Sequence, residues 1–176
     1  MSNKDTVLMV GRLMELAART APKATGQDFI ETVLLSDEQR IKLGEEMVEY
    51  GTRHKIWHHE RDGYNVLASD AVVLIGLLPH LGVGLDCGAC GLSGCAELNT
   101  VSITKEFRGP SCALRLLDLG IALGSAAKVA MDMNVDNRIM YNAGVSAIKL
   151  GYSRANICHG IPLSATGKNI FFDRKG

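Results

Sequence analysis

Four of the five cysteines of this chain lie close together, in a segment rich in glycine. The segment reads Cys87-Gly-Ala-Cys90-Gly-Leu-Ser-Gly-Cys95, and Cys112 follows after sixteen further residues. A Cys-x-x-Cys pair lets two thiolates reach one metal centre from a tight loop, and two further cysteines complete four ligands. In a reducing compartment, clustered cysteines indicate metal or redox chemistry before disulfides. We therefore predict that Cys87, Cys90, Cys95 and Cys112 hold an iron–sulfur cluster.

The residues around these cysteines also suit a cluster. Gly88, Gly91 and Gly94 can adopt unusual backbone dihedrals and bring N–H groups close to the sulfur atoms. Cys112 lies at the expected start of a long helix, where the positive end of the helix dipole favours an anionic cluster. The number of ligands weakly favours a 4Fe–4S cluster over a two-iron form.

Three alternatives compete with this interpretation. Structural zinc also takes four cysteines, but its usual signature has two short Cys-x-x-Cys knuckles, and this chain has one. Disulfides need an oxidising compartment, which nothing in the sequence indicates. Unliganded buried cysteines would not explain the clustering, although Cys158, outside the cluster, is expected to be a small buried residue.

A second group of metal-ligating side chains is formed by His54, His58 and His59. On one helix His54 and His58 would be one turn apart, which is the spacing of ligands for zinc or another divalent metal. A third, well-placed ligand is not evident. We therefore interpret these histidines as part of a polar helix surface.

Composition bounds the class of protein. The 176 residues suffice for one domain, so we expect residues 1–176 to fold as a single unit. The chain has 19 Lys and Arg against 19 Asp and Glu, so the excess positive charge that attracts nucleic acid or anionic lipid is absent. The longest apolar run, 71–79, is far shorter than the roughly 20 residues that span a bilayer. No secretory signal is evident at the start, and we expect a cytoplasmic protein.

Periodicity and turn signals predict an α+β fold. A uniformly apolar run at 71–78 indicates a central strand covered on both faces, and residues 81–112 form an inserted ferredoxin-like loop after it. Ser36 and Gln39 have the spacing of a capping box, which begins a helix. The other expected elements are helices at 5–19, 111–134 and from Asp136 or Asn137 to 148, and strands at 27–35 and 155–161. The expected architecture has three layers, with helices on both sides of a sheet.

The cysteine spacing resembles that of two groups of redox proteins. It is similar to the 4Fe–4S domain of the ferredoxin-like subunit of the Rnf electron-transport complex and to that of the corrinoid iron–sulfur proteins. Cys87, Cys90, Cys95 and Cys112 match the four ligand positions. The resemblance implies a 4Fe–4S cluster.

Over nearly its whole length, the chain resembles an uncharacterised family of ferredoxin-domain proteins from anaerobic bacteria and archaea. Beyond the cysteine motif, the residues that carry this likeness are 17–23, 116–124, 134–138 and 160–173. That family has no established activity. The likeness therefore implies a family and little mechanism.

A more distant resemblance is to the nitroreductase fold of flavoproteins. Ala17-Ala18 with Ala21-Pro22 resembles the end of a helix in that family, and residues 116–124 resemble its long central helix. The likeness implies an α+β homodimer with FMN at the subunit interface. Lys23 stands where that family has serine, and Gly26 replaces an asparagine that contacts the flavin.

These observations predict an iron–sulfur redox protein that carries electrons. Its partner would be a redox protein that docks near residues 85–95, or a small electron acceptor. The alternatives are a nitroreductase-like flavin-dependent oxidoreductase fed by the cluster, and a structural zinc protein. No nucleic-acid or membrane partner is expected.

Overall fold

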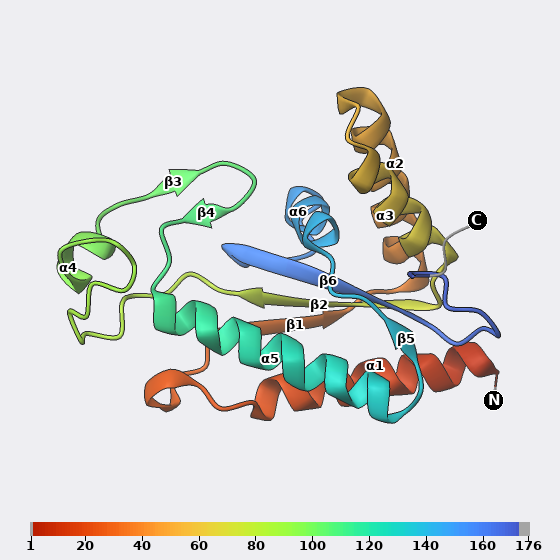
Figure 1. Ribbon diagram of the computed structural model, residues 1–176, viewed down its shortest axis with the longest axis horizontal. Coiled ribbons are helices and arrows are strands. Elements are labelled where there is room, and N and C mark those ends of the chain that lie inside the picture. Colours follow the sequence, from red (N-terminus) through yellow and green to blue (C-terminus); the bar gives the residue numbers. More distant parts are fainter. Residues whose placement is uncertain (1, 173–176) are drawn as a thin grey trace.

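The computed structural model describes residues 2–172 and centres on a four-stranded antiparallel sheet (Figure 1). The strand order is β1-β2-β6-β5. The strands are β1 (Ile30–Leu34), β2 (Ala71–Leu77), β5 (Asp136–Asn137) and β6 (Ile157–Ser164). Asp173, the last residue of the family likeness, lies outside the described residues.

One face of the sheet is covered by two long helices that lie side by side, α1 (Asn3–Thr20) and α5 (Ala113–Asp132) (Figure 1). Ser2 begins α1 with a capping box: its hydroxyl accepts from the N–H of Asp5, whose carboxylate accepts from the N–H of Ser2. The side chains that α1 buries recur at helical spacing. They are Val7, Val10, Met14 and Ala18.

The other face carries α2 (Asp37–His54), α3 (Trp57–Ala68) and α6 (Tyr141–Lys149). The central strand serves both layers, because alternate side chains of a strand point to opposite faces. Val73 and Ile75 pack with α1 and α5, whereas Val72 and Leu74 pack with α2 and α6. Every residue of β2 is buried, which confirms that both faces of this strand are covered.

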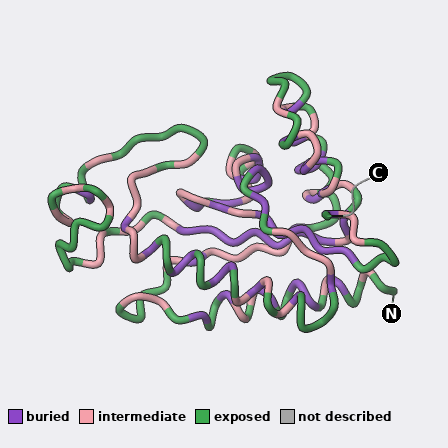
Figure 2. Tube along the Cα trace, viewed as in Figure 1, coloured by how far each residue is buried: buried purple, intermediate pink, exposed green. Residues whose placement is uncertain are grey.

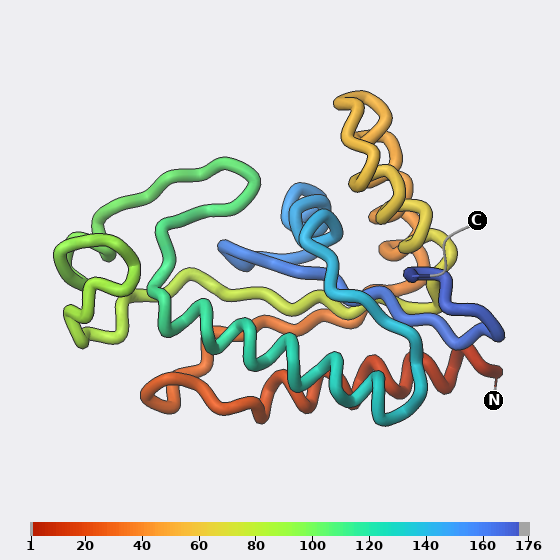
Figure 3. The backbone as a smooth tube through the Cα atoms, viewed as in Figure 1, coloured from red at the N-terminus to blue at the C-terminus, as the bar shows by residue number. Residues whose placement is uncertain are grey.

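The cysteine loop, residues 81–112, joins β2 to α5 and extends to one side of the sheet (Figure 1). It contains the short helix α4 (Cys95–Leu98) and a hairpin of β3 (Ile103–Thr104) with β4 (Arg108–Gly109). Figure 2 shows that this loop is largely exposed, while buried positions concentrate in the strands. Both ends of the described chain lie at the opposite end of the molecule (Figure 3).

Most of the expected elements are confirmed, and the α+β class is correct. Ser36 caps α2 through its capping box with Gln39, as predicted. The expected helix cap at Asp136 or Asn137 is wrong. These two residues form β5, which pairs with Ser164 and Leu163 of β6. The helix begins later, at Tyr141.

Candidate metal centre

Cys112 is the buried member of the four predicted ligands. It is the residue at which α5 begins, and its side chain is 5% exposed. Burial acts to raise the pKa of the thiol. The backbone N–H groups of Val83, Arg115 and Leu114, with the positive charge of Arg115, outweigh burial and lower the pKa below its ordinary value. This position therefore favours a thiolate, the form that ligates metals.

Cys95 lies against the same short segment of backbone. A Cβ atom added to Gly82 would lie 3.0 Å from the Cys95 sulfur, so Gly82 leaves the space that this sulfur occupies. The N–H group of the next residue, Val83, helps to lower the pKa of the Cys112 thiol. The Cys95 N–H donates to Asp86 Oδ1 at 2.7 Å, which fixes the start of α4. Residues 82–83 thus act on two of the predicted ligands: Gly82 leaves space for Cys95, and Val83 lowers the pKa of Cys112.

Cys87 and Cys90 are more accessible. Cys87 is exposed and Cys90 is half-buried. Gly88 and Gly91 have φ of +67° and +83°, in the left-handed region that glycine reaches without a steric cost. The expectation of unusual dihedrals is confirmed at these two positions. It is wrong for Gly94, which is extended; there, an added Cβ would instead lie 2.8 Å from Asp86 Oδ1.

The donor chemistry of the loop fits an iron–sulfur cluster. All five cysteines are free thiols, so no disulfide removes a predicted ligand. Backbone N–H groups lower the pKa of the Cys112 thiol, and such groups also stabilise the sulfur atoms of clusters. Within residues 2–172, no three His, Cys, Asp or Glu side chains are grouped so that they could hold a metal ion. Ligation by Cys87, Cys90, Cys95 and Cys112 therefore stays a prediction.

A cavity of about 570 Å³ adjoins the loop, which we name the loop-side cavity. Its lining comes from two segments of chain, one before β1 and one after β2: Gln27, Phe29, Pro79, His80, Leu81, Gly82 and Val83. His80 Nδ1 lies 2.9 Å from the carbonyl oxygen of Leu78, which can only accept, so this nitrogen carries the proton. Nε2 then accepts from the Cys112 N–H at 3.4 Å. Sequence analysis did not find this residue, because a lone histidine carries no spacing signal.

A buried ion pair positions the other wall of this cavity. Arg115 is 1% exposed and pairs with Asp118 one turn further along α5, at 3.3 Å. Its guanidinium donates to the carbonyl oxygen of Ala24 at 2.8 Å and to Gln27 Oε1 at 2.5 Å. Asp118 Oδ1 accepts from the N–H of Ala24 at 2.8 Å. The pair therefore fastens the turn at 24–27 to the helix that begins at Cys112.

The three neighbouring histidines do not form a metal site. α2 ends at His54 and α3 begins at Trp57, so His54 and His58 are not on one helix, as the ligand spacing required. His58 Nδ1 lies 3.2 Å from Asn142 Nδ2. His59 points inward to Ser146 Oγ at 3.1 Å and is buried, so the interpretation as a polar helix surface is wrong for His59. The turn between the two helices thus separates histidines that are close together in the sequence.

The helices of residues 2–172 do not meet the requirements for a membrane span. None of them combines the length and the apolar character needed to cross a membrane. The cytoplasmic location stays a prediction.

The fold is that of the nitroreductases. The chain is similar to nitroreductase A from Vibrio parahaemolyticus, with a TM-score of 0.56, 10% identity, and coverage of 92% of this chain and 59% of that one. It is similar to a nitroreductase with bound FMN from Desulfitobacterium hafniense, with a TM-score of 0.57, 12% identity, and coverage of 91% and 78%. The NADPH:FMN oxidoreductase from Vibrio harveyi gives a TM-score of 0.55 at 10% identity, with coverage of 92% and 60%. At such identities the likeness shows the fold alone, and the chain spans less than two thirds of two of these proteins.

Sequence comparison gives the family. An uncharacterized protein from Archaeoglobus fulgidus is 44% identical over 174 residues, covering 97% of this chain and 92% of that protein. Residues 108–174 match the family described as uncharacterized protein containing a ferredoxin domain (DUF2148). The chain belongs to this family. The matched segment contains Cys112 but begins after Cys95, so it does not include the other three predicted ligands.

Proposed function

We propose that this protein is an iron–sulfur redox protein in which Cys87, Cys90, Cys95 and Cys112 ligate a 4Fe–4S cluster. One observation carries the proposal: Cys112 is buried at the N-terminus of α5, where backbone N–H groups lower the pKa of its thiol. Such donors stabilise anionic sulfur and tune the potential of a cluster. The ferredoxin domain of the family supports the same chemistry.

When bound, such a cluster exchanges single electrons. One electron would enter from a reduced partner protein and leave to an oxidised one or to a small electron acceptor. The exposed turns that carry Cys87 and Cys90 suit protein docking, because they bring two ligands near the surface. The loop-side cavity suits a small acceptor, because Cys112 donates its N–H to His80, which lines that cavity.

Anaerobic purification tests the proposal. We expect a brown protein with about four irons and four acid-labile sulfides per chain, and a reduced form with the electron paramagnetic resonance signal of a cluster. A colourless protein that contains one zinc per chain would contradict the proposal. It would make the loop a structural zinc clamp, whose fold is lost on treatment with a chelator.

A flavin is the second candidate, and the fold favours it because the nitroreductase from Desulfitobacterium hafniense, which has this fold, has bound FMN. In this version, FMN would bind at a subunit interface and receive electrons from the cluster. Lys23, which stands where the nitroreductase family has serine, does not have its side chain free for a flavin. Its ammonium group donates to the carbonyl oxygens of Ala18, Arg19 and Ala21. FMN released on denaturation of the purified protein would support this candidate. Absence of binding to added FMN would leave the cluster as the redox centre.

A homodimer is the assembly that we propose. Large apolar side chains remain exposed on α1 and α5, the two helices of one layer, and an uncovered apolar surface of this kind is typical of an interface. They are Met9, Leu13, Leu16, Leu116, Leu117, Ile121 and Met131. Light scattering should give twice the chain mass for the protein, and the chain mass for the variant Leu117→Glu/Ile121→Glu. An unchanged mass in that variant would place the interface elsewhere.

A further inference from the structure

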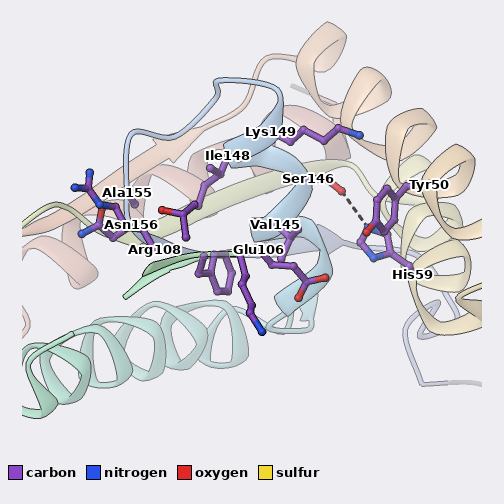
Figure 4. Close-up of a pocket in the computed structure, with 13 residues that line it drawn as sticks. Tyr50, His59, Glu106, Arg108, Val145, Ser146, Ile148, Lys149, Ala155 and Asn156 are labelled. Carbon is purple, nitrogen blue, oxygen red and sulfur yellow. Dashed lines mark hydrogen bonds between the residues drawn. The ribbon is translucent and has the colours of Figure 1, made fainter. Parts of the chain in front are cut away.

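A second cavity, of about 480 Å³, lies on the other face of the sheet from α1 and α5. We name it the helix-side cavity. Its walls are α2 and α3, α6, the segment before β6, and residues 104–108 of the hairpin. Figure 4 shows Tyr50, His59 and Ser146 at one end, and Arg108, Ala155 and Asn156 at the other. It shares no lining residue with the loop-side cavity and contains none of the cysteines.

The walls are largely apolar and aromatic. Val145 and Ile148 of α6 line one side, and Tyr50 and Phe107 contribute rings. Phe107 is held in place by an edge contact with Tyr141, with ring centroids 5.0 Å apart. Cavities of this size and character bury most of the surface of a small organic molecule.

The inner end of the cavity is polar but uncharged. His59 Nε2 lies 3.1 Å from Ser146 Oγ, and both residues are 2% exposed. The ring of Tyr50 packs on His59, with centroids 4.8 Å apart. Burial, with the neighbouring His58, lowers the pKa of His59 below its ordinary value. The pair therefore offers a hydrogen bond to a ligand without placing a charge at this end.

The rim carries an excess of positive charge. Lys105, Arg108 and Lys149 line the cavity, against the single carboxylate of Glu106. Glu106 is already bonded to the Tyr141 hydroxyl, and Lys149 pairs with Glu46 at 2.5 Å. Among the ion pairs of residues 2–172, none includes Lys105 or Arg108. Arg108 Nε donates to Ser102 Oγ at 3.0 Å, which leaves the terminal nitrogens of its guanidinium, with the ammonium group of Lys105, available to a ligand.

We propose that the helix-side cavity binds a small aromatic anion. The aromatic body lies between the side chains of α6 and the ring of Phe107, and the anionic group faces Lys105 and Arg108. A guanidinium beside an apolar cavity suits a carboxylate or sulfonate, which it binds through two parallel hydrogen bonds. The hairpin that supplies both cations follows Cys95 and precedes Cys112, so the ligand site and the cysteine loop share one segment of chain.

A pair of fluorescent probes tests both parts of the proposal. The first is 1-anilinonaphthalene-8-sulfonate, and the second is N-phenyl-1-naphthylamine, which has the same rings but no sulfonate. We expect the purified protein to bind the sulfonate at least about ten-fold more tightly than the neutral probe. Equal affinities would overturn the preference for an anion.

Two variants fill the cavity from opposite walls. Val145→Trp acts from α6, and Thr104→Trp acts from the exposed hairpin, where no core side chain is disturbed. Each should weaken binding of the sulfonate by about ten-fold or more. If a folded Thr104→Trp protein binds it as tightly as the parent, the cavity is not the site. The double variant Lys105→Glu/Arg108→Glu should weaken the sulfonate and leave the neutral probe nearly unaffected.

The control addresses the exposed apolar side chains of α5, which could also bind such a probe. Leu117 and Ile121 lie on the opposite layer of the molecule from the helix-side cavity. The variant Leu117→Gln/Ile121→Gln should therefore retain the parent affinity for the sulfonate. Loss of binding in this control, with binding kept in Val145→Trp, would overturn the proposal and assign the probe to α5.

Discussion

The cysteine loop and the helix-side cavity are assembled in opposite ways. In the loop, Cys87 and Cys90 are neighbours in the sequence and lie on exposed turns. In the cavity, His59 and Ser146 meet across 87 positions and are buried. The cysteines of the loop are brought together by local turns of the backbone. His59 and Ser146 come together only when the helices pack against each other. Spacing in a sequence can therefore reveal the loop but not the cavity.

The two regions also differ in what holds them. Leu98 is the only residue of 81–98 that the described structure buries, so the first half of the loop has little apolar anchorage. The cavity stands on a core that includes Leu43, Met47 and Ala147. We expect the order of the loop to depend on a bound cluster, and that of the cavity to depend on the fold alone.

The largest effect should come from removing one ligand. In Cys112→Ala, the buried thiolate is lost, and iron should fall from about four per chain to less than about one. Cys158→Ala is the matched control, because Cys158 is also a buried cysteine but lies on β6. The control should keep its iron. Both variants should still bind 1-anilinonaphthalene-8-sulfonate, because neither removes a side chain that lines the helix-side cavity.

An equal iron content in Cys112→Ala and in the parent would contradict the assignment of metal binding to the cysteine loop. It would mean that Cys112 is a structural residue and that other ligands hold any metal. Loss of iron in both variants would indicate that the site depends on the whole core and not on the loop.

The next largest effect concerns the ion pair behind the loop. Arg115→Met leaves the Asp118 carboxylate buried without its partner, and should lower the free energy of unfolding by about 3–5 kcal/mol. Arg115→Met/Asp118→Leu removes both charges and should recover part of the loss. Urea denaturation measures both. A loss below about 1 kcal/mol in the single variant would show that the pair does not fasten the turn at 24–27.

A pH change should alter the stability of the protein through His59, which lines the helix-side cavity, and through His159. Burial lowers the pKa of His159, and burial with the nearby His58 lowers that of His59, from an ordinary value of 6.5. As pH falls below 6.5, the unfolded chain takes up protons that the folded protein does not, so stability decreases until the lowered pKa values are reached. We expect a lower Tm at about pH 5.5 than at about pH 7.5.

Asp28 and Asp37 do not contribute to this change. Asp28 and Asp37 have pKa values lowered from 3.8, so their stabilisation is complete above that pH. His59→Gln keeps a hydrogen-bonding group near Ser146 and should reduce the dependence on pH. An equal dependence in this variant would assign the effect to His159.

The sequence predicted the fold where local signals dominate. The capping box at Ser36 was placed correctly, and the uniformly apolar strand predicted at 71–78 is β2 at 71–77, because both follow from short-range chemistry. α3 was missed, since Trp57–Ala68 carries charged and aromatic side chains and follows α2 after two residues. β5 was missed because a strand of two residues forms only through its pairing with β6.

The residues of the candidate site also differ in whether local sequence signals predict them. The cysteines and the dihedrals of Gly88 and Gly91 follow from their types and spacing. His80 and Arg115 do not, because their roles come from contacts with segments that are distant in the chain. A histidine or an arginine alone in a sequence is most often a surface residue.

The smallest effect should come from Gly82, which tests whether the loop and its cavity are shaped for a sulfur atom. A Cβ at this position would lie 3.0 Å from the Cys95 sulfur and 3.3 Å from a methyl carbon of Leu98. The sulfur must shift by a few tenths of an ångström, so Gly82→Ala should assemble the cluster but release iron faster to a chelator than the parent does. Gly120→Ala is the control, because it has open space for a Cβ on α5. Equal rates in both variants would show that the position of the Cys95 sulfur does not limit the stability of the cluster, and that the loop tolerates crowding at this point as an ordinary exposed turn would.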